Sequence, residues 1–163
     1  MATVLVAYAS RHGATHEIAE WIAGALERDG LTVLLRHADE VGDLEGIDAV
    51  VIGGPIYVGR VLIPIPSFFC RHRTALGTMP VALFLSGTLI AAGNPRQDER
   101  GYAIAESVRQ GIPIVALALF GGRFSWARVS IIGRFVPATA PKDTRDRPAI
   151  EAWAKTLPAR FGL

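Results

Sequence analysis

Short, wholly apolar runs alternate with helix-like stretches along the chain. The runs do not alternate apolar with polar residues, which is typical of strands buried on both faces. Between the runs, apolar residues recur at spacings of three and four, which indicates helices with one buried face. The predicted strands are 3–9, 32–36, 49–53, 81–85 and 113–120, and the predicted helices lie around 18–26, 66–76, 98–110 and 148–157.

This order of elements predicts an α/β fold in which helices cover both faces of a parallel sheet. Five strand–helix units in 163 residues fit one doubly wound domain and are too few for a (β/α)₈ barrel. The sequence shows neither an internal repeat nor a linker, so 1–163 is predicted to be a single domain. Its irregular part is an insert at about 121–147, which is too long for a simple connection.

In open parallel sheets, ligands bind beyond the carboxyl ends of the strands. The loop after the first strand is Ser10-Arg11-His12-Gly13-Ala14-Thr15. Free N–H groups at the start of the next helix favour a phosphate there, Ser10 and Thr15 can add hydroxyl donors, and Gly13 permits a tight turn. The loop lacks the Gly-Lys-Ser/Thr of a Walker loop and the spaced glycines of a dinucleotide fold. A simple turn with Thr15 as helix cap explains the same residues equally well.

The loops after the third and fourth strands also have unusual compositions. The second loop is Gly53-Gly54-Pro55-Ile56-Tyr57-Val58-Gly59-Arg60, and the third is Ser86-Gly87-Thr88-Leu89-Ile90-Ala91-Ala92-Gly93-Asn94. The glycines permit close approach to a flat ligand, on which Tyr57 could stack, although Tyr57 taken alone fits a turn with its ring in the core better. The third loop is small and uncharged, as the wall of an aromatic ligand's site should be.

Together, these three loops resemble those of a flavodoxin-type FMN domain, and the resemblance covers the whole chain. Within that group the chain is similar to the bacterial flavodoxin-domain proteins that include menaquinone-dependent protoporphyrinogen dehydrogenase. The insert and the stretch Asp143-Thr144-Arg145-Asp146 before a Trp-containing last helix carry this finer likeness. The resemblance implies a flavodoxin-like doubly wound, five-stranded parallel sheet of order 2-1-3-4-5 in a three-layer sandwich, with FMN as cofactor.

The resemblance also implies which residues hold FMN. The phosphate would lie on 10–15, the isoalloxazine ring between 56–59 and 86–94, and the flavin N5 near the peptide at Gly59. The implied cofactor-binding residues are Ser10, Arg11, His12, Gly13, Ala14, Thr15, Pro55, Ile56, Tyr57, Val58, Gly59, Ser86, Gly87, Thr88, Gly93 and Asn94. Because the flavin supplies the chemistry, no catalytic acid or base is required, and no metal is expected.

Charge is distributed unevenly along the chain. Residues 1–50 hold three arginines against nine carboxylates, and the rest holds fourteen basic against six acidic residues. No carboxylate occurs from 49 to 97, whereas Arg11, Arg60 and Arg96 lie near the proposed flavin loops. Positive charge there should stabilise the reduced, anionic flavin and raise its potential.

This charge pattern favours an oxidoreductase that feeds a quinone-like acceptor over a low-potential carrier. Together with the resemblance, which implies FMN and the protoporphyrinogen/quinone type, it predicts an FMN-dependent oxidoreductase that passes electrons from a small organic substrate to a quinone-like acceptor. Two alternatives stay open. One is a flavodoxin-type electron carrier without its own substrate, and the other is a flavin-free interaction protein on the same fold. A quinone or a redox protein is the expected partner, and the lack of long basic runs with aromatics speaks against nucleic acid.

The insert suggests one further contact. Residues 124–136 interleave aromatic and β-branched side chains with arginines, as in segments that lie on anionic membranes. Packing as an extra helix on the sheet edge explains the same pattern. The start Met1-Ala2-Thr3 carries no basic-then-apolar leader, which predicts a cytoplasmic protein, with peripheral membrane association if 124–136 binds lipid.

Other chemistries fit the residues poorly. His12 and His16 are four residues apart, but no third metal ligand has a suitable spacing. A phospho-receiver domain needs acidic residues at strand ends that here hold Ser10 and Gly53. Cys70 follows two phenylalanines and is predicted to lie in the core rather than to react.

Overall fold

A parallel sheet forms the centre of the molecule. The computed structural model describes residues 1–88, 90, 94–123 and 143–163. Five parallel strands run in the order β2-β1-β3-β5-β6, and a short sixth strand, β4, pairs antiparallel with β3. The strands are β1 (Thr3–Tyr8), β2 (Thr32–His37), β3 (Ala49–Tyr57), β4 (Arg60–Val61), β5 (Val81–Gly87) and β6 (Ala116–Gly121). The predicted doubly wound sheet and the order of its five parallel strands are confirmed.

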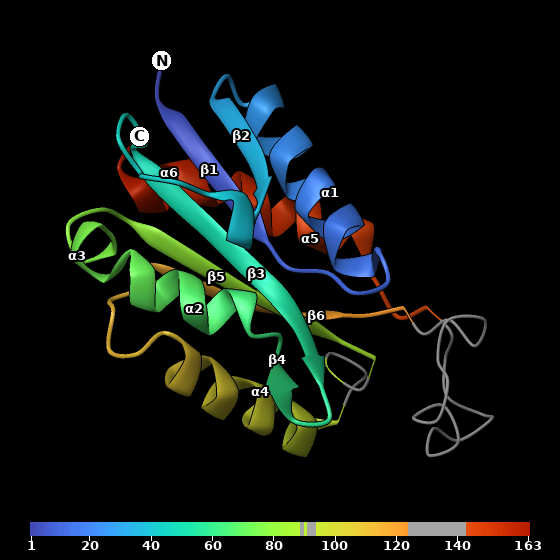
Figure 1. Ribbon diagram of the computed structural model, residues 1–163. Helices are drawn as coiled ribbons and strands as arrows, with labels where there is room; N and C mark the ends of the chain where they lie inside the picture. The colour runs from blue at the N-terminus through green and yellow to red at the C-terminus, as the bar shows by residue number, and fades with distance from the viewer. Residues whose placement is uncertain (89, 91–93, 124–142) are drawn as a thin grey trace.

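Helices cover both faces of this sheet (Figure 1). α1 and α5 pack on one face, and α2 and α4 pack on the other. The helices are α1 (Ala14–Arg28), α2 (Pro64–Arg71), α3 (Arg73–Leu76), α4 (Pro95–Val108), α5 (Arg147–Lys155) and α6 (Leu157–Phe161), with a 3₁₀ turn η1 (Ala38–Glu40) after β2. The result is the three-layer arrangement that the sequence predicted.

The two faces of each central strand contribute to different cores. In β1, Val4 and Val6 pack toward α1 and α5, whereas Leu5 and Ala7 pack toward α2 and α4. Each fully buried valine or leucine side chain stabilises the fold by about 1.5–3 kcal/mol. The demand for apolar residues on both faces explains why the sequence shows unbroken apolar runs.

The strands next to the proposed site are longer than predicted. β3 continues through Tyr57 into a hairpin with β4, and β5 includes Ser86 and Gly87, where loops were expected. Pro55 and Ser86 are paired in this extension of the sheet. Gly53 lies within β3, and a Cβ at this position would lie 2.2 Å from the Phe84 ring. Close packing, rather than a turn, therefore explains why this position is glycine.

Three other predicted boundaries were wrong. β6 starts at Ala116 rather than Pro113. α4 starts three residues before Asp98, after an Asn94 cap whose Oδ1 accepts from the Arg96 N–H at 3.1 Å. The last helix divides into α5 and α6 at Thr156, because Pro158 has no N–H to continue the ladder.

The prediction that Cys70 lies in the core was also wrong. Its side chain is exposed at the end of α2, while its neighbours Phe68 and Phe69 are fully buried. A helix turns by about 100° per residue, so three consecutive side chains cannot all face the same core.

The predicted insert at about 121–147 is described only at its two ends. Arg123 and Asp143 form an isolated antiparallel bridge. The Thr144 N–H donates to the Gly122 carbonyl at 2.9 Å, and the Gly122 N–H donates to Thr144 Oγ1 at 3.1 Å. We call Gly121–Arg123 and Asp143–Arg145 the neck of the insert. The segment 124–136, for which membrane contact and packing as an extra helix were the two alternatives, lies outside the described residues.

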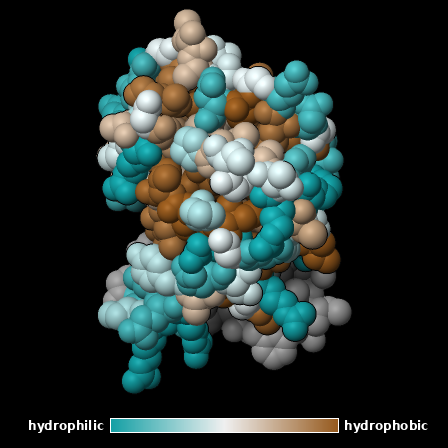
Figure 2. Space-filling model, turned by 90° about the vertical axis from the view of Figure 1, so that its left-hand side faces the viewer, coloured by the Kyte–Doolittle hydropathy of each residue, from teal (hydrophilic) through white to brown (hydrophobic). Residues whose placement is uncertain are grey.

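Within the described part of the chain, no helix is both long and apolar enough to cross a membrane. On the face shown in Figure 2, brown apolar patches are interspersed with teal polar side chains.

Candidate functional site

The turn from β1 into α1 forms the first part of the site. The Ala9 N–H donates to the Gly53 carbonyl at 3.0 Å, which ties the turn to β3. Ser10 Oγ accepts from the Gly13 N–H at 2.9 Å and closes the turn. Gly13 has a φ of +86° and open space around the Cβ position, so the left-handed backbone is what requires glycine there.

The N-terminus of α1 has no side-chain cap. Gly13 occupies the cap position, so the alternative in which Thr15 caps the helix is wrong. The first N–H groups of a helix have no acceptor within the helix, and the helix dipole makes this end positive. A phosphate group therefore fits this turn through its N–H donors and its field.

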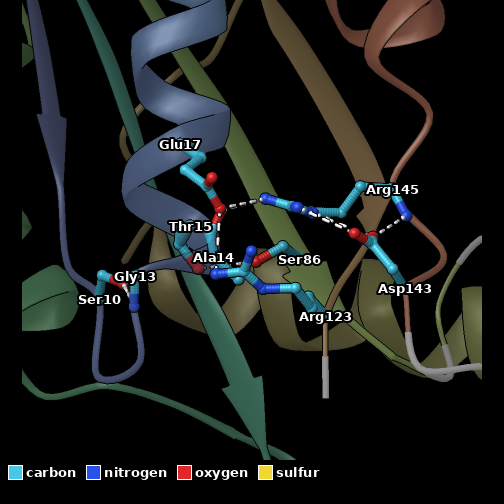
Figure 3. A network of polar contacts seen from close by, with 9 residues as sticks. All are labelled: Ser10, Gly13, Ala14, Thr15, Glu17, Ser86, Arg123, Asp143 and Arg145. Atoms are coloured by element: carbon cyan, nitrogen blue, oxygen red, sulfur yellow. Dashed lines mark hydrogen bonds and ion pairs between the residues drawn. The ribbon is translucent and has the colours of Figure 1, made fainter. Parts of the chain in front are cut away.

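Thr15 and Ser86 join α1 to the carboxyl end of β5. Their hydroxyl oxygens are 3.0 Å apart, and both residues are only 2% exposed (Figure 3). In such a pair one hydroxyl donates to the other, and the proton of the second hydroxyl stays available for another acceptor. The pair thus holds the first and third predicted loops together and retains one polar hydrogen for a ligand.

The β3–β4 hairpin forms another wall of the site. Tyr57 pairs with Arg60 across a two-residue turn of Val58 and Gly59. Both turn residues have positive φ angles, of +48° and +74°, and Val58 is 83% exposed. Two-residue hairpins prefer positive φ at both positions, but a β-branched residue in this region is strained. The strain lies at the tip that was expected to approach the flavin.

Side chains of the first loop contact the hairpin. The His12 ring meets the half-buried Tyr57 ring edge to face at 6.0 Å between centroids. The Arg11 guanidinium lies 5.9 Å from the centre of the same ring. Burial raises the pKa of the Tyr57 hydroxyl, an effect that the Arg11 charge opposes, so the phenol is neutral at physiological pH.

The structure therefore brings most of the predicted residues to one edge of the sheet. Ser10–Thr15, Pro55–Gly59 and Ser86–Thr88 all lie at or just beyond the carboxyl ends of β1, β3 and β5. Asn94 serves as the cap of α4. Gly93 lies outside the described residues.

A group of charged residues that was not predicted from the sequence lies beside the first loop (Figure 3). Glu17, in the first turn of α1, accepts from Arg145 Nη1 at 2.7 Å and lies 3.1 Å from Arg123 Nη2. Arg145 also pairs with Asp143, at 2.9 Å. Glu17 and Arg145 are 128 positions apart, so no spacing in the sequence indicates their contact.

Arg145 is the centre of this group. Its side chain is only 6% exposed, and its guanidinium lies 4.8 Å from the centre of the Trp21 ring. The hydrogen bond from Arg145 lowers the pKa of the Asp143 carboxyl, and the same bond raises the pKa of Arg145. The two arginines of this group balance the charge of its two carboxylates. Arg145 fixes one side of the neck against α1.

Among the residues that the structure describes, no group of three or more histidine, cysteine or acidic side chains could hold a metal ion. His16 stacks on Tyr8 at 4.7 Å between ring centroids, and its Nε2 lies 3.7 Å from Glu20. His12 faces Tyr57 instead.

The geometry agrees with the comparisons to known proteins. Residues 5–148 match the model of a family described as flavodoxin domain. Over 89 residues the chain is 36% identical to protoporphyrinogen IX dehydrogenase [quinone] of Escherichia coli K12. The alignment covers 53% of this chain and 49% of that protein, so the chain spans about half the length of the curated relatives it matches.

Solved structures of similar fold include three flavodoxins. One is from the domain Archaea, with a TM-score of 0.60, 16% identity and 99% of each chain covered. A short-chain flavodoxin associated with a bacterial microcompartment gives a TM-score of 0.61, 16% identity and 98% coverage of each chain. Oxidised Flavodoxin 2 from Bacillus cereus gives 0.59 and 20% identity, with 98% of this chain and 100% of that chain covered. At such identities the likeness shows the fold alone.

Proposed function

Because the chain belongs to the flavodoxin domain family, we propose that it is an FMN-dependent oxidoreductase that passes electrons from a small organic substrate to a quinone-like acceptor. The bound flavin would supply the electron-transfer chemistry. The protein's residues would hold the cofactor, set its potential and control access to it. None of them needs to act as a catalytic acid or base.

The first loop supports the proposed binding of FMN. The uncapped start of α1 offers N–H donors and a positive dipole to the phosphate. The Thr15–Ser86 pair has one hydroxyl proton to donate, and Gly13 holds the turn open. We propose that the phosphate binds Ser10–Thr15 through these groups.

The hairpin and the end of β5 would bind the isoalloxazine ring. Tyr57 presents a half-buried, neutral aromatic ring at this edge, suited to stacking on a flat ligand. The peptide at Gly59 lies at the exposed tip of the hairpin, where it would reach the flavin N5. Ser86–Thr88 would form the opposite wall, with Gly93 and Asn94 continuing it.

The observation that carries the proposal is the charge of this edge. Arg11 and Arg60 flank the hairpin, and no carboxylate occurs between positions 49 and 97. Glu17 is the acidic residue closest along the chain to the phosphate turn, and two arginines neutralise it. A cofactor that gains negative charge on reduction is therefore stabilised in its reduced form, which raises its potential. Such a flavin suits an oxidoreductase that feeds a quinone.

A flavodoxin-type electron carrier is the second candidate. One observation favours it: this chain and two solved flavodoxins share their fold over 98–99% of both lengths, although this likeness by itself assigns no role. A carrier would have no substrate of its own, and its flavin would have a low potential. The flavin-free alternative predicts that the purified protein binds no FMN at all.

The reduction potential of bound FMN distinguishes these candidates. We expect a two-electron potential above that of free FMN, measured by spectroelectrochemical titration. Replacing Arg11 and Arg60 by Gln should lower it, while Arg73→Gln, on α3 at the opposite edge of the sheet, should leave it unchanged (Figure 1). A potential well below that of free FMN would instead identify a carrier.

The substrate requires a separate assay. The name of the Escherichia coli relative suggests protoporphyrinogen IX, with a quinone as acceptor. The FMN-loaded protein should reoxidise with a menaquinone analogue after anaerobic reduction by this porphyrinogen. If the quinone rapidly reoxidises the reduced flavin but the porphyrinogen does not reduce it, the protein is still an oxidoreductase, and protoporphyrinogen IX is not its substrate.

A further inference from the structure

Arg123 lies where the first and third loops meet. Its Nη2 is 3.1 Å from Glu17 Oε2, in the first turn of α1 (Figure 3). The residue before it, Gly122, packs against β5, because a Cβ on Gly122 would lie 3.0 Å from the backbone of Gly87 and Thr88. Arg123 is thus placed beside the phosphate turn by the neck of the insert.

Glu17 has a second partner that is better fixed. Arg145 Nη1 donates to the same Oε2 atom at 2.7 Å, and the Arg145 side chain is 6% exposed. Asp143 holds the other side of this guanidinium through two further hydrogen bonds, at 3.0 and 2.9 Å. Glu17 therefore keeps a buried counter-ion even when Arg123 leaves it.

Arg123 is the more accessible of the two arginines. Its side chain is 38% exposed, its ion pair is with Glu17, and, after the hydrogen bond from Arg145, its charge also contributes to lowering the pKa of the Asp143 carboxyl. A guanidinium binds phosphate oxygens in the same forked geometry in which it binds carboxylates. A phosphate at the start of α1 carries more negative charge than the Glu17 carboxylate, so it would compete with Glu17 for the Arg123 guanidinium.

We infer that Arg123 is a further phosphate-binding residue, which exchanges Glu17 for the phosphate monoester of FMN when the cofactor binds. Arg145 is then the positioning residue that holds Glu17 and the neck in place. This inference rests on the proposed binding of FMN. It gives the described ends of the insert a role in cofactor recognition that the sequence analysis did not assign to them.

Comparing FMN with riboflavin tests the inference, because riboflavin lacks the phosphate. Dissociation constants are measured by flavin fluorescence for wild type, Arg123→Gln, Glu17→Gln and the exposed control Arg73→Gln. Arg123→Gln should weaken FMN binding about 10-fold, the effect of one charge-assisted hydrogen bond, and change riboflavin binding less than about 2-fold. Glu17→Gln should tighten FMN binding and leave riboflavin unchanged.

Each other result has a distinct meaning. Equal losses of both flavins in Arg123→Gln would show a purely structural role at the neck and overturn the inference. An unchanged FMN affinity in that variant would also overturn it, while leaving the proposed function intact. If wild type binds neither flavin, both the inference and the proposed function fail.

Salt dependence gives an independent readout. Raising the ionic strength should reduce the preference of wild type for FMN over riboflavin, and reduce it less in Arg123→Gln, which has already lost the charge. An identical salt response in the two proteins would contradict a direct contact between Arg123 and the phosphate.

Discussion

The hydroxyl pair between α1 and β5 allows the most detailed prediction. Thr15→Val and Ser86→Ala each remove one hydroxyl and leave the other, 2% exposed, without its partner at 3.0 Å. An unpaired buried polar group costs about 1–3 kcal/mol. We therefore expect each single variant to lose about 1–3 kcal/mol of unfolding free energy in the absence of cofactor.

The double variant should lose less than the sum of the two. With both hydroxyls gone, no polar group of the pair stays buried without a partner, and the net cost of one lost hydrogen bond is about 1 kcal/mol. The coupling energy between Thr15 and Ser86 should be at least about 1 kcal/mol. Urea unfolding of all four proteins, with one shared m-value, measures it. Strictly additive losses would refute the pairing.

The same variants test the role of the spare proton. In each single variant the remaining hydroxyl can still donate to a phosphate, so FMN affinity should change little. The double variant should bind FMN about 10-fold more weakly and lose less affinity for riboflavin, which shares the ring but lacks the phosphate. If one single variant alone loses the full 10-fold of FMN affinity, the phosphate contact belongs to the hydroxyl removed in that variant. The idea that either hydroxyl can donate to the phosphate would then be wrong.

Three further predictions concern the fold around the site. Val58→Asn should stabilise the chain by about 1 kcal/mol in urea unfolding, because asparagine tolerates the +48° φ of this turn; a loss of stability would disprove the strain. Gly53→Ala should cost about 1–3 kcal/mol through the contact with Phe84, whereas Gly42→Ala, with open space, should be near neutral; equal effects would contradict the packing argument. Burial is the main cause that lowers the pKa of the His72 imidazole below 6.5 in the folded chain. The neutral His72 therefore contributes fully to the unfolding free energy above pH 6.5, and this contribution is lost as the pH falls through the folded-state pKa. His72→Phe should flatten the decline in thermal stability between pH 7 and 5, and an unaltered pH profile would rule this out.

The central strands could be predicted because their burial demands a recognisable pattern. Both faces of β1 and β3 are covered, so their residues are apolar without interruption, and this marks a parallel sheet in any sequence. The turn at Ser10–Thr15 could be predicted for a similar reason, since a strand, a glycine and a helix follow one another locally.

The ends of β3 and β5 could not be predicted from local sequence. Gly53 and Gly54 are typical of loops, and only the position of Phe84 and Ile65 over their Cα atoms shows why a strand contains them. The contact of Glu17 with Arg145 joins residues 128 positions apart and depends on how α5 returns to α1. The sequence shows that Glu17 and Arg145 are present, but it does not show that they form an ion pair.

The proposed function depends on FMN binding, which titration of the purified, flavin-free chain with FMN measures. We expect saturable quenching of flavin fluorescence at one FMN per chain, which Gly13→Val abolishes by excluding the +86° φ that the phosphate turn requires. A correctly folded wild-type chain that shows no saturable binding of FMN would disprove FMN as the cofactor.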